Sequence, residues 1–282
     1  MADALISPMV AVTMLATTVG LATYSVHKVQ NEMDNKKIPL MGVMGAFIFA
    51  AQMINFTIPG TGSSGHIGGG MLLTILLGPY AGFLTMASIL LIQALFFADG
   101  GLLAYGCNVF NLGFFACFIA YPMIYKYLTR KAVTPRRILL ASLISVVVAL
   151  QLGAFSVVLE TFFSGQTELP FSTFVLMMQP MHLAIGLVEG LVTAAIVTFI
   201  WQARPEIINR ATTDNSLGNP PITKVVIGLA IAVILVGGGL SWFTSAKPDG
   251  LEWSILQIYG SPELAATDAI YQKVAAIQKQ TA

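Results

Sequence analysis

The stretch that decides the fold is ILLASLISVVVALQLGAFSVVL, residues 138–159, which contains no charged residue. About 20 consecutive apolar residues are enough for a helix to cross the hydrocarbon core of a bilayer, which is about 30 Å thick. Arg136 and Arg137 precede the stretch and Glu160 follows it. Residues 136–162 therefore predict a membrane-spanning helix.

The composition extends this prediction to the whole chain. Hydrophobic residues make up 56% of the 282 residues and charged residues only 10%, whereas soluble domains carry about 25% charged residues. We therefore predict an all-α integral membrane protein and exclude a soluble globular enzyme. The net charge of +1 gives no field that would gather nucleic acid. The period-two alternation of transmembrane strands is missing, so strands are not expected.

Several further apolar runs have the length of a membrane span. The predicted spans are 9–27, 39–58, 80–97, 103–128, 136–162, 173–202 and 222–244. Residues 67–78 are apolar but too short to span alone, so we predict a half-length helix packed inside the protein, because bare backbone cannot face lipid. Gly78-Pro79 closes that segment. The expectation is about seven transmembrane helices and one short half-helix.

Basic residues predict the orientation. Three loops between the predicted spans carry most of the 14 Lys and Arg residues: Lys28, Lys36 and Lys37; Lys126, Arg130, Lys131, Arg136 and Arg137; and Arg204, Arg210 and Lys224. By the positive-inside rule these loops face the cytoplasm. We therefore expect the amino terminus and the carboxyl tail outside the cell (inner or cytoplasmic) membrane.

The chain divides at a polar linker, residues 203–221, which contains Arg204-Pro205 and Asn219-Pro220-Pro221. Such a composition is typical of a boundary between modules. We expect a transmembrane domain over 1–202, a cytoplasmic linker over 203–221, and a transmembrane helix with an extracytoplasmic tail over 222–282.

His66 is the most informative residue for chemistry. It lies in the glycine-rich segment GTGSSGHIGGG, residues 60–70, at the start of the short helix. Glycine permits close approach of the backbone, and imidazole is a good ligand for nickel, cobalt, copper or zinc. The terminal amine of Met1, predicted on the same side of the membrane, suits a square-planar ion such as Ni²⁺. His66 and Met1 are therefore candidate metal ligands; the alternative is a histidine hydrogen-bonded at a helix start.

Two polar residues precede that loop. Gln52 and Asn55 are three positions apart, so on a helix they would share a face. They could hydrogen-bond a metal ligand and orient it, or they could bond neighbouring helices. The sequence leaves both roles open.

Three further residues are weaker candidates. His182 and Glu189 lie two turns apart in the span 173–202, and a carboxylate inside a membrane is costly and marks a candidate functional site. Glu189 could pair with His182, neutralise an ion, or anchor helix packing as a protonated hydrogen-bond donor. Asp99, in a turn with two glycines, could attract cations or serve the turn alone.

Two observations limit the function classes. The motif Gly-x-x-x-x-Gly-Lys-[Ser/Thr] is absent, so an ATPase that powers transport must be a partner. Gly62-Ser63-Ser64-Gly65 matches the Gly-x-Ser-Gly of rhomboid-type intramembrane proteases, with Ser64 as nucleophile and His182 as base. The match is four residues long and the serine precedes the helix, so the protease is a remote alternative.

Several motifs, in order, resemble the CbiM/NikM family. They are LMGVMGAFIFAAQMINF (40–56), Ser64-Gly65-His66, Gly68-Gly69-Gly70, QALFFADGG (93–101) and PMHLAIGLVEG (180–190). These proteins are the membrane-embedded substrate-binding components (S-components) of energy-coupling factor transporters for cobalt or nickel. The tail motif PDGLEW (248–253) resembles the small companion subunit of CbiN/NikN type, fused here after the linker.

The resemblance implies an S-component-like bundle that captures Co²⁺ or Ni²⁺ for an ATP-driven importer serving cobalamin biosynthesis or nickel enzymes. It implies no enzymatic activity and no resident cofactor. The implied partners are a coupling subunit of CbiQ/NikQ type and a cytoplasmic ATPase of CbiO/NikO type, besides membrane lipid. An S-component for an organic vitamin is the alternative.

The resemblance also implies the metal ligands: the amino-terminal amine, a histidine at position two, and the histidine of Ser-Gly-His. His66 matches the last of these and Met1 offers the amine, but position two is Ala2. We therefore expect the native start to lie upstream, with Met-His before Met1. In the chain as written the site would lack one imidazole, and Asp3 would be a poor substitute.

Overall fold

The computed structural model describes residues 1–282 except 32–36, 167–169, 206–207, 209–222, 262–268 and 282. Most of the predicted linker, as well as Lys36 and Arg210, lies outside the described residues. Within the described part, five helical segments are long and apolar enough to cross a membrane. They are α1 (Pro8–Asn31), α4 (Pro79–Phe96), the continuous run of α5 (Tyr105–Val109), η2 (Phe110–Tyr125) and α6 (Lys126–Thr129), α7 (Pro135–Ser164), and α8 (Phe171–Ala203).

One of the seven predicted spans is shorter than expected, because helix α2 (Lys37–Gln52) ends six residues before the predicted boundary at 58. The predicted span 222–244 contains a continuous helical run, in which α10 (Thr223–Ile234) is followed by the π-helix η3 (Leu235–Gly239) and the 3-10 helix η4 (Leu240–Phe243). Three consecutive glycines, Gly237–Gly239, weaken the helix there. The helical class is confirmed, and five of the predicted spans are long, apolar helices within the described residues.

A short β pair follows α2 and was not expected from the sequence. Strand β1 (Phe56–Thr57) pairs antiparallel with β2 (Ser64–Gly65). The Asn55 carbonyl, just before β1, accepts a hydrogen bond of 2.8 Å from the backbone N–H of Ser245. Contacts with the distant C-terminal segment therefore accompany the early end of α2.

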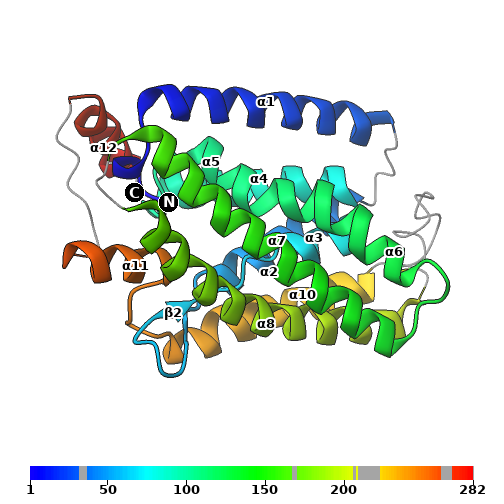
Figure 1. The fold of residues 1–282 in the computed structure, drawn as a ribbon. Helices are drawn as coiled ribbons and strands as arrows, with labels where there is room; N and C mark the ends of the chain where they lie inside the picture. The colour runs from blue at the N-terminus through cyan, green and yellow to red at the C-terminus, as the bar shows by residue number, and fades with distance from the viewer. Residues whose placement is uncertain (32–36, 167–169, 206–207, 209–222, 262–268, 282) are drawn as a thin grey trace.

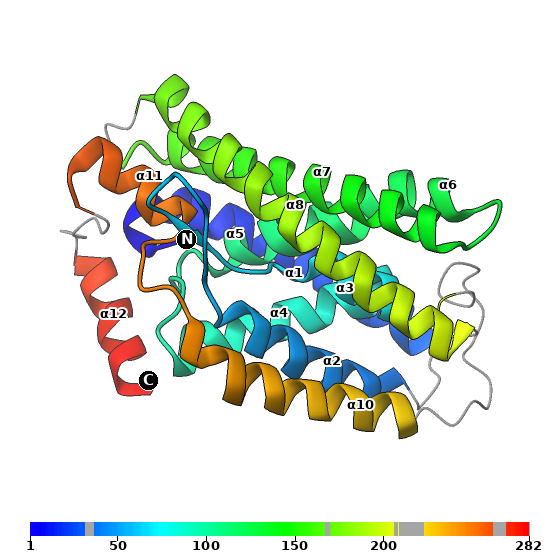
Figure 2. The same ribbon diagram turned by 90° about the horizontal axis from the view of Figure 1, so that it is seen from below.

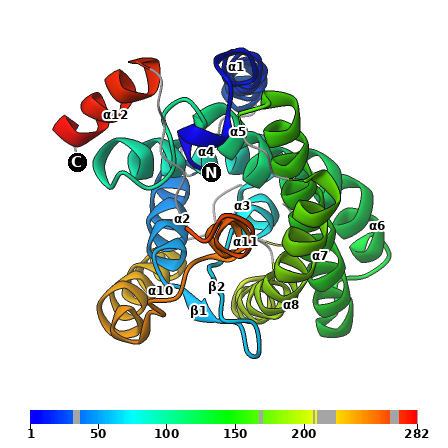
Figure 3. The same cartoon turned by 60° about the vertical axis from the view of Figure 1, so that its left-hand side comes forward.

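The short apolar run forms α3 (Gly70–Leu77), and all of its residues are buried. Gly78 has a φ of +85°, donates its N–H to the Thr74 carbonyl at 2.9 Å, and is followed directly by Pro79 at the start of α4. This confirms the predicted boundary at Gly78-Pro79. Viewed along the bundle, α3 lies near the centre, with α2, α4, α7 and α8 around it (Figure 3).

The outer helices pack around this core in two groups. Helices α7 and α8 run side by side, and α10 lies along α2 (Figure 2). Helix α1 lies at the periphery against α4 and α5, where its Thr18 hydroxyl donates to the Gly106 carbonyl at 2.8 Å. Its other face is exposed and apolar, with Met9 82% exposed, as suits a surface in contact with lipid.

The amino terminus, the β pair and the C-terminal helices gather at one end of the bundle, and α6 lies at the other (Figure 1). Helix α11 (Gly250–Tyr259) begins with a capping box between Asp249 and Glu252 and ends at Gly260, where φ is +73°. Helix α12 (Ala269–Thr281) contacts α4. This end of the molecule contains the candidate site.

Candidate metal site

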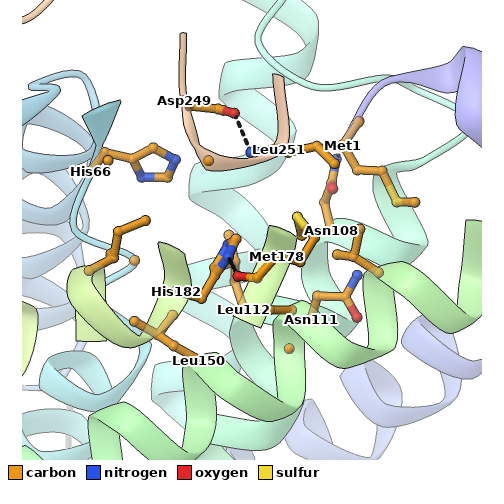
Figure 4. A pocket seen from close by; sticks show the side chains of 17 residues that line it. Met1, His66, Asn108, Asn111, Leu112, Leu150, Met178, His182, Asp249 and Leu251 are labelled. Atoms are coloured by element: carbon orange, nitrogen blue, oxygen red, sulfur yellow. Dashed lines mark hydrogen bonds between the residues drawn. The ribbon is translucent and has the colours of Figure 1, made fainter. Parts of the chain in front are cut away.

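A cavity of about 130 Å³ lies where the amino terminus, the β2–α3 loop, α8 and the start of α11 meet. Its polar lining comprises Met1, His66, Asn108, Asn111, His182 and Asp249. Figure 4 shows the rings of His66 and His182 at this cavity, with Met1 and Asn108 across from them. Of the candidates from the sequence, the fold brings together Met1, His66 and His182.

The backbone around His66 is held by the C-terminal tail. The Ser64 N–H donates to the Pro248 carbonyl at 2.8 Å, and the Ser64 hydroxyl donates to the Lys247 carbonyl at 2.7 Å. Gly65 lies so close to Ile185 of α8 that a Cβ there would be 2.5 Å from Cγ1. The loop before His66 is therefore fixed from two sides.

Glu189 holds the backbone just after His66. Its carboxylate, 2% exposed, accepts hydrogen bonds from the backbone N–H groups of Gly68 at 2.7 Å and Gly69 at 2.8 Å. These N–H groups stand at the start of α3, where an anion is favoured. Glu189 does anchor its surroundings, but it accepts hydrogen bonds from a loop, whereas the sequence suggested a protonated donor between helices. Among the described residues Glu189 is not hydrogen-bonded to His182: both carboxylate oxygens bond the loop, and the His182 Nδ1 bonds the Met178 carbonyl at 2.9 Å.

Gln52 supports the same loop from α2. Its Nε2 donates to the Gly68 carbonyl at 2.7 Å, and its Oε1 accepts from Gln93 Nε2 at 2.8 Å. The predicted sharing of a helix face with Asn55 is wrong, because α2 ends at Gln52 and Asn55 lies beyond it. Gln93 was not identified from the sequence, although a buried amide within the apolar span 80–97 is a recognisable signal.

The first residues of the chain are anchored beside the cavity. The Met1 carbonyl accepts from the Gly101 N–H at 3.0 Å and from Asn108 Nδ2 at 3.2 Å. The Asp3 carboxylate accepts from the Ala104 N–H at 2.9 Å, and burial raises the pKa of Asp3 above its ordinary value. These contacts fix the main chain of Met1 at the wall of the cavity.

Asp99 lines a second, larger cavity. This space of about 440 Å³ is bordered by four acidic residues, Asp3, Asp99, Asp249 and Glu252. It shares Met1, Asp249 and Leu251 with the smaller cavity. Asp249 was not singled out from the sequence, because its role as the cap of α11 brings it to the site only in the folded chain.

The small cavity suits an ion better than an organic molecule. Pockets for organic ligands occupy about 300–1,000 Å³, more than twice the volume found here, and no Phe, Tyr or Trp is among the described residues that line it. Imidazole and amine nitrogens favour nickel, cobalt, copper or zinc. Among the described residues, no three His, Cys, Asp or Glu side chains converge to hold a metal by themselves, so other nitrogen donors must complete a site.

The geometry contradicts an intramembrane protease. Ser64 is fully buried, and its hydroxyl donates to backbone carbonyls of the tail. The Nδ1 of His182 is hydrogen-bonded to the Met178 carbonyl and not to Ser64. The serine therefore lacks both exposure to a substrate and the hydrogen bond to a base that nucleophilic attack requires.

Comparison with known proteins agrees with this picture. A family described as "Cobalt uptake substrate-specific transmembrane region" (CbiM) matches residues 1–207, and the PDGLE domain matches residues 223–282. A putative fused nickel transport protein NikMN from Archaeoglobus fulgidus is 34% identical over 238 residues, covering 83% of this chain and 77% of that protein.

A second relative and a solved structure are also described as metal transporters. A fused nickel transport protein NikMN from Rhodobacter capsulatus is 32% identical over 73% of this chain and 62% of that one. A crystal structure of a transition metal transporter superposes with a TM-score of 0.64 at 30% identity, covering 72% of this chain and 92% of that one.

Proposed function

Since the chain belongs to the CbiM family of cobalt uptake substrate-specific transmembrane proteins, we propose that the cavity between His66 and the amino terminus captures a Co²⁺ or Ni²⁺ ion. The family makes the chain the substrate-specific component of a cobalt or nickel uptake transporter. It is a multi-pass membrane protein and not an enzyme. The ion is the cargo, and no resident cofactor is involved.

The observation that carries the proposal is the placement of His66. Its ring borders a cavity of ion size, and the loop on both sides of it is held by buried hydrogen bonds from Ser64 and to Glu189. The amino-terminal segment is the proposed source of the second nitrogen donor, because Met1 lines the same cavity. Nitrogen donors disfavour the hard ions Mg²⁺ and Ca²⁺, which take oxygen ligands.

The larger cavity is the proposed path of the ion. Its four carboxylates, from Asp3, Asp99, Asp249 and Glu252, raise the local concentration of cations, and its shared wall leads to His66. Asp99 then acts by attraction rather than as a ligand. Glu189 and Gln52 act on the loop rather than on the ion.

The proposed topology has about seven crossings and the half-helix α3. Helix α2 and the run from α10 to η4 supply the two crossings beyond the five long helices. The basic residues around α6 lie at the end of the bundle opposite the amino terminus (Figure 1). By the positive-inside rule that end faces the cytoplasm, and both termini lie outside the cell membrane.

The proposed division of the chain is a metal-binding domain over 1–202, a cytoplasmic linker over 203–221, and a helix with an extracytoplasmic tail over 222–282. Family membership implies an energy-coupling factor transporter assembly. The proposed partners are a coupling subunit of CbiQ/NikQ type and an ATPase of CbiO/NikO type, with the basic cytoplasmic loops as their docking surface.

Calorimetric titration of the full chain in detergent with Ni²⁺ and with Co²⁺ tests the proposal. We expect stoichiometric binding that is lost in His66→Ala and retained in His27→Ala, a matched change of an exposed histidine on α1. Binding that survives His66→Ala contradicts the proposed site. Absence of binding of either ion contradicts the proposed cargo.

A further inference from the structure

Resting on the metal-capture function proposed above, we propose that His182 supplies a second imidazole ligand to the captured ion. His182 comes from α8, and His66 comes from the β2–α3 loop. Both side chains border the same cavity, as Figure 4 shows. The ion would therefore join the loop to the long helix α8.

The hydrogen bond of His182 leaves the correct nitrogen free. Its Nδ1 lies 2.9 Å from the Met178 carbonyl, and a carbonyl can only accept, so Nδ1 carries the proton. Nε2 then has an unprotonated lone pair, the form in which imidazole binds metals. A backbone carbonyl bonded to the other ring nitrogen is the usual support of a metal-binding histidine.

His66 has the same arrangement. Its Nδ1 lies 3.4 Å from the Ile67 carbonyl, at the long limit of a hydrogen bond. This contact also favours the proton on Nδ1 and the lone pair on Nε2. The two rings therefore present equivalent nitrogens to one cavity.

The free nitrogen of His182 has no described partner. Within the residues that the structure describes, Nε2 has no hydrogen-bond partner, and the cavity wall combines the apolar side chains of Leu150, Met178 and Ile185 with the polar side chains of His66 and Asp249. The tail covers the ring from the other side, because a Cβ on Gly250 would lie 3.5 Å from Cε1. An imidazole nitrogen directed into so small a space is satisfied by a ligand or by water.

Helix α8 can adjust to close the site. Pro180, two residues before His182, has no N–H to bond the carbonyl four residues earlier, so the helix can bend there. Nitrogens bind such metals at about 2.0–2.1 Å, which would bring the two Nε2 atoms to about 3–4 Å from each other. Pro180 is therefore the point at which α8 would bend to bring His182 towards His66.

Counting imidazoles on the bound metal tests the inference directly. The chain contains three histidines, His27, His66 and His182, so the full chain must be purified without a histidine tag. After loading with Cu²⁺ as the probe, pulsed electron paramagnetic resonance detects the remote nitrogen of each coordinated imidazole. We expect two imidazoles in the unsubstituted chain and in His27→Ala, and one in His182→Ala.

The same series separates this inference from the proposed function. In Ni²⁺ titrations we expect His182→Ala to weaken binding at least tenfold, with His27→Ala unchanged. One imidazole in the unsubstituted chain, lost in His66→Ala and unaffected by His182→Ala, overturns the role of His182 and leaves the proposed function standing. No metal binding in the unsubstituted chain overturns both. The count in the unsubstituted chain does not depend on whether any variant folds.

Discussion

Replacing Glu189 by alanine should release the loop that carries His66. The carboxylate is buried and accepts two backbone N–H groups, from Gly68 at 2.7 Å and from Gly69 at 2.8 Å. A buried donor that loses its partner costs about 1–3 kcal/mol. Two such donors give an expected loss of about 2–6 kcal/mol in the free energy of unfolding. Glu189→Gln retains one acceptor oxygen and should lose about half as much.

The assay combines stability with local exchange. Denaturant unfolding of the detergent-solubilised protein gives the total loss, and hydrogen exchange of peptides covering residues 60–74 reports the loop. A local loss of about 2 kcal/mol or more corresponds to at least roughly 30-fold faster exchange at Gly68 and Gly69. The matched control is Gln151→Ala, which removes a hydrogen bond of 2.9 Å from α7 to the Gln179 carbonyl of α8, away from the loop.

The exchange rates at Gly68 and Gly69 decide whether Glu189 supports the loop. If Glu189→Ala destabilises the protein while exchange at Gly68 and Gly69 stays as slow as in the Gln151→Ala control, the carboxylate supports helix packing and not the loop. Equal losses in Glu189→Gln and Glu189→Ala would also contradict the assignment, because the amide oxygen can still accept one N–H.

Two further predictions concern the backbone around the site. Gly69→Ala should destabilise the protein by more than Gly60→Ala in thermal unfolding. Both glycines have φ near +80°, a conformation that costs other residues about 1–2 kcal/mol. Only at position 69 would the new Cβ also meet a side chain, Ile48 Cγ2 at 2.6 Å. Equal shifts would show that Ile48 moves aside freely. The Asp249 carboxylate caps α11 by accepting hydrogen bonds from the N–H groups of Leu251 and Glu252, each at 2.8 Å. For Asp249→Ala we therefore expect a loss of about 0.5–2 kcal/mol in the free energy of unfolding and faster release of bound Ni²⁺ in stopped-flow chelation. Unchanged release would mean that α11 does not cover the ion.

The parts of the fold that the sequence predicts are those fixed by local chemistry. The boundary at Gly78-Pro79 follows from a glycine with positive φ and a proline without an N–H. Long apolar runs such as α7 follow from their length and composition alone. The end of α2 does not, because the segment after it contacts a residue near the far end of the chain, Ser245.

The candidate site likewise contains residues with a local sequence signal and residues that only long-range contacts bring to it. His66 and Met1 are identifiable because their residue types and positions suggest metal ligands, and the structure brings them to one cavity with His182. Asp249 reaches that cavity only because the tail folds back over the loop. Contacts that join residues far apart in the sequence leave no periodic signal in either segment.

The buried polar residues around the His66 loop have a shared physical explanation. An irregular backbone buried among apolar helices requires a partner for each buried N–H and carbonyl. Glu189 satisfies two N–H groups of the loop, and Gln52, supported by Gln93, satisfies the Gly68 carbonyl. The rule that an intramembrane carboxylate marks function therefore finds the region of the site, and the hydrogen bonds of Glu189 show a structural role there. Glu189 thus stabilises the non-helical loop that presents His66 to the cavity.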